Sequence, residues 1–272
     1  MNNIIKQVSA LITEVRNKVP LVHQITNYVT VNDCANITLA IGASPIMADD
    51  MAEAADITAI SSALVINIGT LNERTVSSML ASGKRANALG IPVVFDPVGA
   101  GASKLRNDTT RTILKEVRLS VLRGNLSEVS FVAGLKATTR GVDASEADSI
   151  NDAVTITKDT AQMLGCTVAV TGAVDVISDG RRTVTIQNGH KMLSNVTGTG
   201  CMATALIGAF AGVTDDSLLA AAAGIAAMGI AGEIAFNAAG GKGTGSFRSS
   251  IIDAVSLLDE NLMEESANIN EI

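Results

Sequence analysis

The chain has 272 residues, of which 47 % are hydrophobic, 17 % are charged and only 2 % are aromatic. This composition is typical of a folded protein with a large aliphatic core and excludes a disordered chain. The net charge of −7 argues against a general nucleic-acid binder and against docking on an anionic membrane. Three cysteines without a CxxC pair exclude a zinc ribbon and predict a reducing, cytoplasmic location.

Short β-branched apolar runs alternate along the chain with helical patterns. Residues 1–18 are predicted to form an amphipathic helix rather than a signal peptide, because charged residues interrupt the apolar positions. Strands are expected at residues 21–26, 63–69, 92–96, 166–172 and within 120–129; helices are expected at residues 29–41 and 149–164 and in a segment that ends at Gly90. From Met202 onward the pattern is helical, with a glycine-rich break before a last helix of roughly residues 246–263.

This alternation with short connections predicts a mostly parallel central sheet with helices on both faces, a three-layer α/β/α fold. Two alternating runs around Asp179-Gly180 add an antiparallel hairpin. Residues 1–272 are predicted to form one domain without a separate lid domain. The two most apolar runs, residues 203–213 and 218–232, are shorter than a membrane-spanning helix needs and are expected to be buried.

The stretch "NVTGTGCMATAL" (195–206) places Gly198, Thr199 and Gly200 directly before Cys201 at the start of an apolar run. Glycines let backbone N–H groups approach a ligand, and a helix N-terminus holds an anion. The same field is expected to lower the pKa of the Cys201 thiol. The pattern predicts an anion hole with a reactive group; a glycine-rich helix start with a small buried cysteine stays open. Cys34 and Cys166 lie in apolar patterns and are expected to be inert.

Polar residues follow the expected strands, where an open parallel sheet binds its ligand. Asp96 ends an apolar strand before a glycine-rich loop and suits a hard cation such as Mg²⁺. The segment "RGNLSE" adds Arg123, which can pair with phosphate, and Asn125 with Glu128, which suit a hydrated metal. Each group also has a structural alternative: Asp96 as a cap for loop amides, and Asn125 with Glu128 as a helix capping box.

Other familiar motifs are incomplete in this chain. "GGKGTGS" has Gly after the Lys, where a Walker loop requires Ser or Thr, and "VGAGAS" lacks the third Gly of the dinucleotide fingerprint. His23 and His190 are far apart in the sequence and form no HExxH-type pair, so catalytic zinc is not expected.

The segments taken together resemble the hydroxyethylthiazole kinase family of the ribokinase-like superfamily. The matching segments are "VHQITNYVTVNDCANITLAIGASPIMA" (22–48), "INIGT" (66–70), "PVVFDPVGAGAS" (92–103), "RGNLSE" (123–128), "VAVTGAVD" (168–175) and "NVTGTGCMATA" (195–205). They cover nearly the whole chain from about residue 20, and the combination of "ITNYV", "GASPIMA" and "GTGCM" is specific to this family.

The resemblance implies a ribokinase-like fold and a kinase that uses ATP and Mg²⁺ to phosphorylate the side-chain hydroxyl of 4-methyl-5-(2-hydroxyethyl)thiazole, a step of thiamine salvage. The implied site comprises Met47, Asn27 and Gly198 for the thiazole, Arg123 and Thr171 for ATP, Asp96 and Glu128 for Mg²⁺, Gly198, Thr199 and Gly200 as the anion hole, and Cys201 as a weak base beside the acceptor hydroxyl. Most ribokinase-like kinases have Asp at the position of Cys201. The resemblance also implies a homotrimer with active sites at the subunit interfaces.

A weak base is tolerable there, because phosphoryl transfer passes through a loose transition state in which positioning and charge neutralisation dominate. Three alternatives stay open. The same fold could accept another alcohol, such as a hydroxymethylpyrimidine or a sugar. Cys201 could be the nucleophile of an acyl transferase or hydrolase, which would need a nearby histidine. The chain could also bind a ligand without catalysis.

Overall fold

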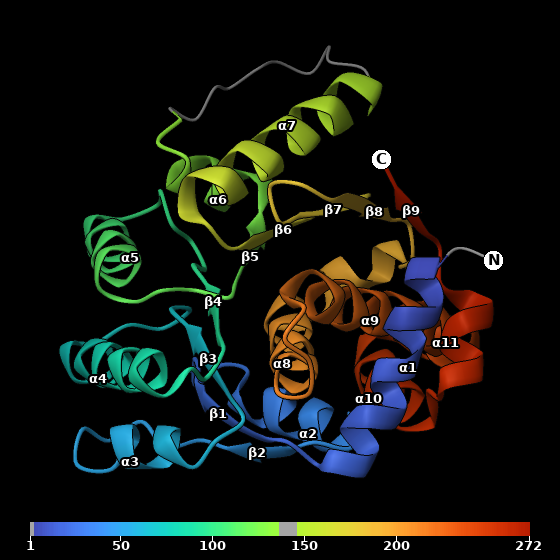
Figure 1. The fold of residues 1–272 in the computed structure, drawn as a ribbon. Helices are drawn as coiled ribbons and strands as arrows, with labels where there is room; N and C mark the ends of the chain where they lie inside the picture. The colour runs from blue at the N-terminus through green and yellow to red at the C-terminus, as the bar shows by residue number, and fades with distance from the viewer. Residues whose placement is uncertain (1–2, 136–145) are drawn as a thin grey trace.

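The computed structural model describes residues 3–135 and 146–272, and nine strands of these residues form one sheet (Figure 1). The strands are β1 (Leu21–Ile25), β2 (Ser44–Ile46), β3 (Ala63–Asn67), β4 (Val93–Asp96), β5 (Val121–Asn125), β6 (Thr167–Thr171), β7 (Asp175–Ser178), β8 (Thr183–Ile186) and β9 (Ile269–Glu271). The α-helices are α1 (Asn3–Lys18), α2 (Val31–Ile41), α3 (Ala54–Ala59), α4 (Glu73–Leu89), α5 (Lys104–Glu116), α6 (Leu126–Val132), α7 (Glu146–Leu164), α8 (Thr199–Ala211), α9 (Ser217–Ala239), α10 (Thr244–Leu257) and α11 (Glu260–Ser266), with 3-10 turns η1 (Lys191–Asn195) and η2 (Gly240–Lys242).

The sheet has the order β2-β1-β3-β4-β5-β6-β7-β8-β9. The strands from β2 to β6 in this order are parallel, and β7, β8 and β9 continue the sheet in antiparallel pairing. The predicted hairpin is confirmed as β7 and β8, which turn at Asp179-Gly180. The sheet is therefore mostly parallel, as expected.

Two edge strands and one helix boundary differ from the sequence-based expectation. Strand β2 carries Pro45, which lacks a backbone N–H and is tolerated because the strand lies at the sheet edge. Strand β9 at the opposite edge has only three residues, too few to show a pattern. The prediction of a single last helix was wrong, because the chain forms α10 and then α11. Asp259 caps the start of α11 by accepting a hydrogen bond from the Leu262 N–H.

Helices cover both faces of the sheet, with α3 to α7 on one side and α1, α2 and α8 to α11 on the other (Figure 1). Alternation along β3 shows how the sheet serves both layers. Leu64 and Ile66 belong to the core beneath α4 and α5, whereas Val65 belongs to the core beneath α8 and α9. Period-two side-chain direction thus produces the three layers that the sequence predicted.

Helix α9 is longer than its apolar run suggested, because it continues through Glu233 to Ala239. The segment Ser217–Lys242 is the one stretch in the described part of the chain that could cross a membrane by length and hydropathy. Its most apolar window is 83 % buried inside the molecule. The expectation that the run is too short was wrong, and the expected burial is confirmed.

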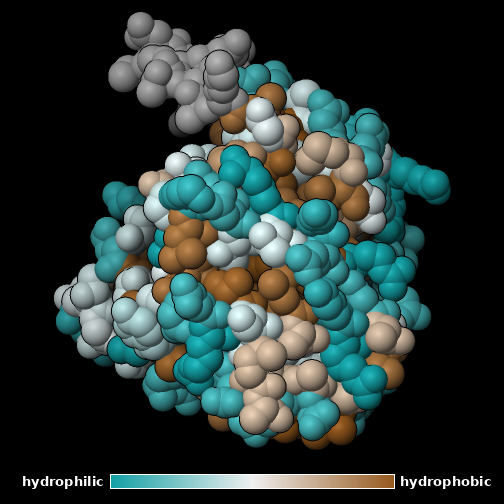
Figure 2. Space-filling view, turned by 90° about the vertical axis from the view of Figure 1, so that its left-hand side faces the viewer, coloured by the Kyte–Doolittle hydropathy of each residue, from teal (hydrophilic) through white to brown (hydrophobic). Residues whose placement is uncertain are grey.

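The helices of the other layer are amphipathic. On the side that carries α3, α4 and α5, hydrophilic residues form most of the outer surface and surround a hydrophobic area near its middle (Figure 2). Helix α4 is a clear case: it starts with a capping box at Asn72, buries Met79 and Ala86, and ends at Gly90 in the left-handed conformation. The predicted end of this helix is confirmed.

Candidate active site

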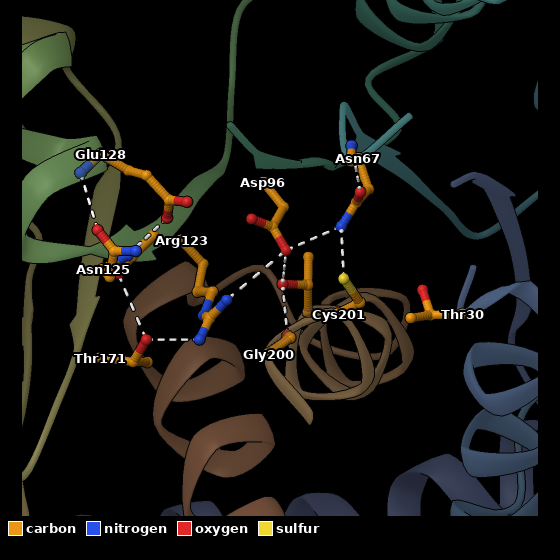
Figure 3. A network of polar contacts seen from close by, with 12 residues as sticks. Thr30, Asn67, Asp96, Arg123, Asn125, Glu128, Thr171, Gly200 and Cys201 are labelled. Carbon is orange, nitrogen blue, oxygen red and sulfur yellow. Dashed lines mark hydrogen bonds and ion pairs between the residues drawn. The ribbon is translucent and has the colours of Figure 1, made fainter. Parts of the chain in front are cut away.

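Polar side chains converge at the carboxyl ends of the central parallel strands, opposite the N-terminus of α8 (Figure 3). The last residues of four adjacent strands are Asn67 of β3, Asp96 of β4, Asn125 of β5 and Thr171 of β6. Because parallel strands end at the same edge of a sheet, residues far apart in the sequence meet there. Helix α8 brings Gly200 and Cys201 to the same place from the last third of the chain.

Asp96 is the centre of this network and is fully buried. Its Oδ2 accepts hydrogen bonds from Asn67 Nδ2 at 2.9 Å and Thr204 Oγ1 at 2.8 Å, and lies 3.6 Å from Arg123 Nη1. Its Oδ1 is buried without a hydrogen-bond partner. Burial raises the pKa of Asp96 to about 6, although Arg123 opposes the shift. A buried carboxylate oxygen without a partner is costly unless a ligand uses it, and a cation or a hydroxyl group would do so.

The Arg123 guanidinium lies between β6 and the first turn of α8. Its Nη2 donates to Thr171 Oγ1, and it packs so closely on Gly200 that a Cβ there would fall 2.6 Å from Nη1. Its buried Nε has no hydrogen-bond partner. The first N–H groups of an α-helix also lack partners within the helix. A guanidinium beside such a helix start forms a site for an anion.

Gly198 is the residue before α8 and has φ 87°, in the left-handed region. A Cβ on it would overlap Thr30 Cγ2, so both its conformation and its surroundings require glycine. A glycine is therefore required directly before α8, and the role of Gly198, Thr199 and Gly200 as an anion hole stays a prediction.

Cys201 is half-buried, and two amide groups donate to its sulfur. Asn67 Nδ2 lies 3.2 Å and Asn27 Nδ2 lies 3.3 Å from Sγ. Burial, and next the charge of Asp96, raise the pKa of the thiol, and the amide hydrogen bonds oppose this shift. The expected lowering of this pKa was wrong, because the loss of water around the sulfur outweighs the groups that favour the thiolate. Cys201 is therefore a neutral thiol at neutral pH.

Glu128 forms the capping box that was its structural alternative. Its Oε2 accepts from the Asn125 N–H at 2.8 Å, and Asn125 Oδ1 accepts from the Glu128 N–H at 2.9 Å. Its Oε1 accepts from the Gly99 N–H at 2.8 Å. Both oxygens thus hold backbone amides, and each keeps a lone pair for a water molecule.

The two predicted metal residues fit a hydrated Mg²⁺ better than a closed protein cage. Among residues 3–135 and 146–272, no three or more His, Cys, Asp or Glu side chains gather in an arrangement for a metal ion. Mg²⁺ keeps several of its waters and needs only one or two carboxylates. The free Oδ1 of Asp96 and the spare lone pairs of Glu128 meet that requirement. The role of these residues in binding Mg²⁺ stays a prediction.

Other site residues are placed less centrally. Met47 follows β2, is half-buried and packs against the core on the α8 side, so its role stays a prediction. Three residues of the network were not assigned by the sequence: Asn67, Thr204 and Thr30. Asn67 lies at one of the strand ends where the sequence predicts the ligand site, but the sequence assigned no role to it. Thr204 lies within an apolar helix, where nothing in the sequence marks it.

Neither histidine forms a pair with Cys201. His23 is buried, with Nε2 at 2.7 Å from Ala48 O and Nδ1 at 2.8 Å from Thr58 Oγ1. His190 stacks on Phe236. Neither histidine is therefore placed to act as the base that a cysteine nucleophile requires. Cys34 and Cys166 are buried, and burial raises the pKa of each to about 12, which agrees with the expected inert role.

Comparison with known proteins decides the family. The model of the hydroxyethylthiazole kinase family matches residues 12–261. The chain belongs to the hydroxyethylthiazole kinase family. A hydroxyethylthiazole kinase of Ruminiclostridium cellulolyticum is 68 % identical over 273 residues, with 100 % of both chains covered. Another, of Clostridium beijerinckii, is 64 % identical and covers 100 % of this chain and 99 % of its own.

Solved structures agree with this assignment to the hydroxyethylthiazole kinase family. The hydroxyethylthiazole kinase of Pyrococcus horikoshii superposes with a TM-score of 0.90 at 42 % identity, covering 98 % of this chain and 99 % of its own. The pyridoxal kinase of Staphylococcus aureus superposes with a TM-score of 0.58 at 16 % identity, covering 79 % of this chain and 88 % of its own, which shows the fold alone. The fold is ribokinase-like, and the chain is an enzyme of the kinase class.

Proposed function

We propose that the chain transfers the γ-phosphoryl group of ATP to the hydroxyl of 4-methyl-5-(2-hydroxyethyl)thiazole and so serves thiamine salvage. Membership in the family supports a kinase, and the names of the relatives specify the thiazole alcohol. The observation that carries the proposal is the free Oδ1 of buried Asp96 beside Arg123, with Cys201 joined to Asp96 through Asn67.

ATP would bind on the Arg123 side of the network. Arg123 and Thr171 contact the phosphates, and the amides of Gly198, Thr199 and Gly200 receive the γ-phosphoryl group. Preorganised donors of this kind stabilise the charge that spreads over the phosphoryl oxygens in the transition state. The unpartnered Nε of Arg123 supports this role, because an anion would complete the hydrogen bonding of the guanidinium.

The acceptor alcohol would bind on the Cys201 side, with Met47, Asn27 and Gly198 around the thiazole ring. Because the pKa of Cys201 is raised, its sulfur is a weak base toward the acceptor hydroxyl. Its main contribution is to hold that hydroxyl in line with the γ-phosphoryl group. The loose transition state makes this sufficient, because the hydroxyl proton leaves late.

Asp96 and Glu128 would hold Mg²⁺ through water molecules. When bound, the ion supplies positive charge that neutralises the phosphates. The proposal further takes residues 1–272 as one domain of a cytoplasmic homotrimer with active sites at subunit interfaces. Tyr28 and Val29, which follow Asn27 directly, are 79 % and 55 % exposed, and this apolar surface supports a second subunit covering this side of the site.

Turnover of the thiazole alcohol tests the proposal. Coupled release of ADP should require the alcohol, ATP and Mg²⁺ together. A panel containing a hydroxymethylpyrimidine and a sugar should show a much lower kcat/KM for both. Absence of turnover with the thiazole alcohol would count against the function, and preference for another alcohol would change the acceptor while keeping the kinase.

Substitution of Cys201 separates a kinase from a thiol-nucleophile enzyme. We expect Cys201→Asp to keep or raise the rate, because a carboxylate is a stronger base toward the acceptor hydroxyl and no covalent step is lost. Cys166→Ala is the matched control, since Cys166 is buried directly before β6, away from the network. Loss of all activity in Cys201→Asp, with an active Cys166→Ala control, would favour the covalent alternative.

A further inference from the structure

Arg106, in the first turn of α5, holds two loops that lead to the active site. Its Nη1 donates to the backbone carbonyls of Ile68 and Val98, and its Nη2 donates to the Gly69 carbonyl at 2.7 Å. Within residues 3–135 and 146–272 it forms no ion pair with a carboxylate, so its hydrogen bonds serve the backbone alone. The half-buried guanidinium therefore donates only to backbone carbonyls, two of them after β3 and one after β4. Hydrogen bonds from a charged group are strong enough to hold these two loops in place.

One of these loops connects Arg106 to the reacting groups. The Gly69 N–H donates to Asn67 Oδ1 at 2.9 Å, while the Gly69 carbonyl accepts from Arg106. Gly69 also lies against Asn27, so closely that a Cβ on it would fall 2.7 Å from Asn27 Nδ2. The amide of Asn67 in turn donates to both Asp96 and Cys201. The position of Gly69 therefore controls the orientation of both Asn67 and Asn27.

The second loop connects Arg106 to Glu128. Val98, whose carbonyl accepts from Arg106, precedes Gly99, whose N–H donates to Glu128 Oε1 at 2.8 Å. Gly99 lies against the Arg106 side chain, with its Cβ position 3.1 Å from Cδ. Arg106 thus joins the ends of β3 and β4, and Glu128 joins the ends of β4 and β5. Two charged side chains fix three successive strand ends.

We infer that Arg106 is a positioning residue for phosphoryl transfer: it holds the loops after β3 and β4 so that Asn67 keeps Asp96 and Cys201 in their working geometry. The inference rests on the proposed function. The planar guanidinium donates in fixed directions to all three carbonyls, which the single nitrogen of lysine cannot reproduce. Because a shift of about 1 Å at a reacting group can cost on the order of 100-fold in rate, a residue that touches no substrate can control kcat.

Removal of the guanidinium should therefore change kcat more than KM. We expect Arg106→Met to lower kcat by roughly 10- to 100-fold and to change KM for ATP and for the alcohol by less than about threefold. Arg106→Lys should retain part of the rate, because Nζ can reach one or two of the carbonyls. Arg111→Met is the matched control: Arg111 lies on the same helix with a side chain that is 65 % exposed, and its substitution should leave kcat near wild type.

Chemical rescue distinguishes positioning from general damage to the fold. Millimolar methylguanidinium should restore the kcat of Arg106→Ala at least about fivefold, because it can occupy the vacated site and donate to the same carbonyls. Methylammonium should not. Wild-type kcat in both Arg106→Met and Arg106→Lys would overturn the inference, as would equal rescue by the two ions.

A measurement without substrate separates this inference from the proposed function. Amide hydrogen exchange at Gly69 and Gly99 should be faster in Arg106→Met than in wild type and Arg111→Met, with no nucleotide or alcohol present. If the wild-type protein phosphorylates no alcohol, the proposed function fails while the exchange still reports on the loops. If exchange at both glycines is unchanged in Arg106→Met, and also in Arg106→Lys should the first variant not fold, the inference fails.

Discussion

The buried carboxylate of Asp96 lowers the free energy of unfolding of the protein. Its carboxylate is fully buried, one oxygen has no partner, and the Arg123 nitrogen is 3.6 Å away rather than in close contact. Burial therefore raises its pKa from the ordinary 3.8 to about 6. The Asp96 carboxyl group therefore binds a proton more tightly in the folded protein than in the unfolded chain. Ionisation of Asp96 consequently lowers the free energy of unfolding.

Asp96→Asn should therefore stabilise the protein while abolishing kinase activity. Asparagine resembles the protonated form of Asp96. The contribution of protonated Asp96 to the free energy of unfolding is fully present below pH 3.8 and is lost as the pH rises through about 6. In EDTA and without nucleotide, denaturant titrations at pH 8 should show the variant more stable by about 2–3 kcal/mol. The gain should shrink toward zero at pH 4.

The control for this prediction is Asp108→Asn on α5. The Asp108 side chain is 48 % exposed and accepts a hydrogen bond from Lys104, which lowers the pKa of the carboxyl group. Its substitution should leave the free energy of unfolding near the wild-type value at both pH 8 and pH 4. The predicted destabilisation by ionised Asp96 would be contradicted if Asp96→Asn were no more stable than wild type at pH 8. It would also be contradicted if the variant gained as much free energy of unfolding at pH 4 as at pH 8.

At the scale of residues, the sequence predicted which side chains form the site but not the hydrogen bonds that join them. The strand-end pattern indicated Asp96 and Arg123, and the glycine-rich helix start indicated Cys201. The bridging role of Asn67 depends on its distances to side chains of β4 and α8, which no single segment encodes. The pKa of Cys201 was misjudged for the same reason, because the burial of the sulfur is a property of the packed molecule.

At the scale of elements, the start of α8 is the most constrained feature of the site. The helix begins after Gly198 in the left-handed conformation, with Thr30 from the start of α2 directly against it. Thr30 in turn donates to Asn27 Oδ1 at 3.1 Å. The residues at the start of α8 and the side chains around Cys201 are therefore fixed by one close approach between two helix N-termini.

Gly198→Ala should destabilise the protein more than an equivalent change elsewhere. We expect a loss of about 2–4 kcal/mol, combining backbone strain with overlap on Thr30 Cγ2. Gly90→Ala, at φ 72° with no atom within 4 Å of its Cβ position, should lose only about 1 kcal/mol. Denaturant unfolding measures both. Thr30→Ser removes Cγ2 and should recover part of the loss in the double variant; no recovery would contradict the steric explanation.

Most element positions followed from local signals, and the failures have local causes. Helices α2 and α4 end at Gly42 and Gly90 as predicted, because both glycines adopt left-handed conformations. The break between α10 and α11 was missed because it contains neither Gly nor Pro, and Asp259, which caps α11, was included in the predicted helix. Strand β2 was missed because a three-residue segment containing Pro45 has no strand pattern of its own.

At the scale of the whole molecule, the C-terminal residues add an edge strand to the sheet. Strand β9 pairs with β8, and Ile269 packs into the core that α1, α9 and α10 share. The Ile272 N–H also donates to Thr183 O at 3.0 Å. The last residues thus cover an edge that would otherwise expose unpaired backbone groups.

Ile269→Ala should lower the free energy of unfolding by about 2–4 kcal/mol, because it leaves a cavity beside β8. Ile272→Ala is the matched control, since that side chain is 64 % exposed and its loss should cost less than about 0.5 kcal/mol. Thermal and denaturant melts of both variants test this. Equal losses in the two variants would show that β9 does not contribute to the core.

The late position of α8 in the chain has a consequence for biosynthesis. Gly208 of this helix packs on Val22 of β1 and Val65 of β3, which the ribosome delivers more than 140 residues earlier. A nascent polypeptide that ends before Thr199 has neither Cys201 nor the cover for that side of its first strands. Catalytic competence therefore arises only when translation is well advanced, and until then the uncovered apolar side is a target for chaperones.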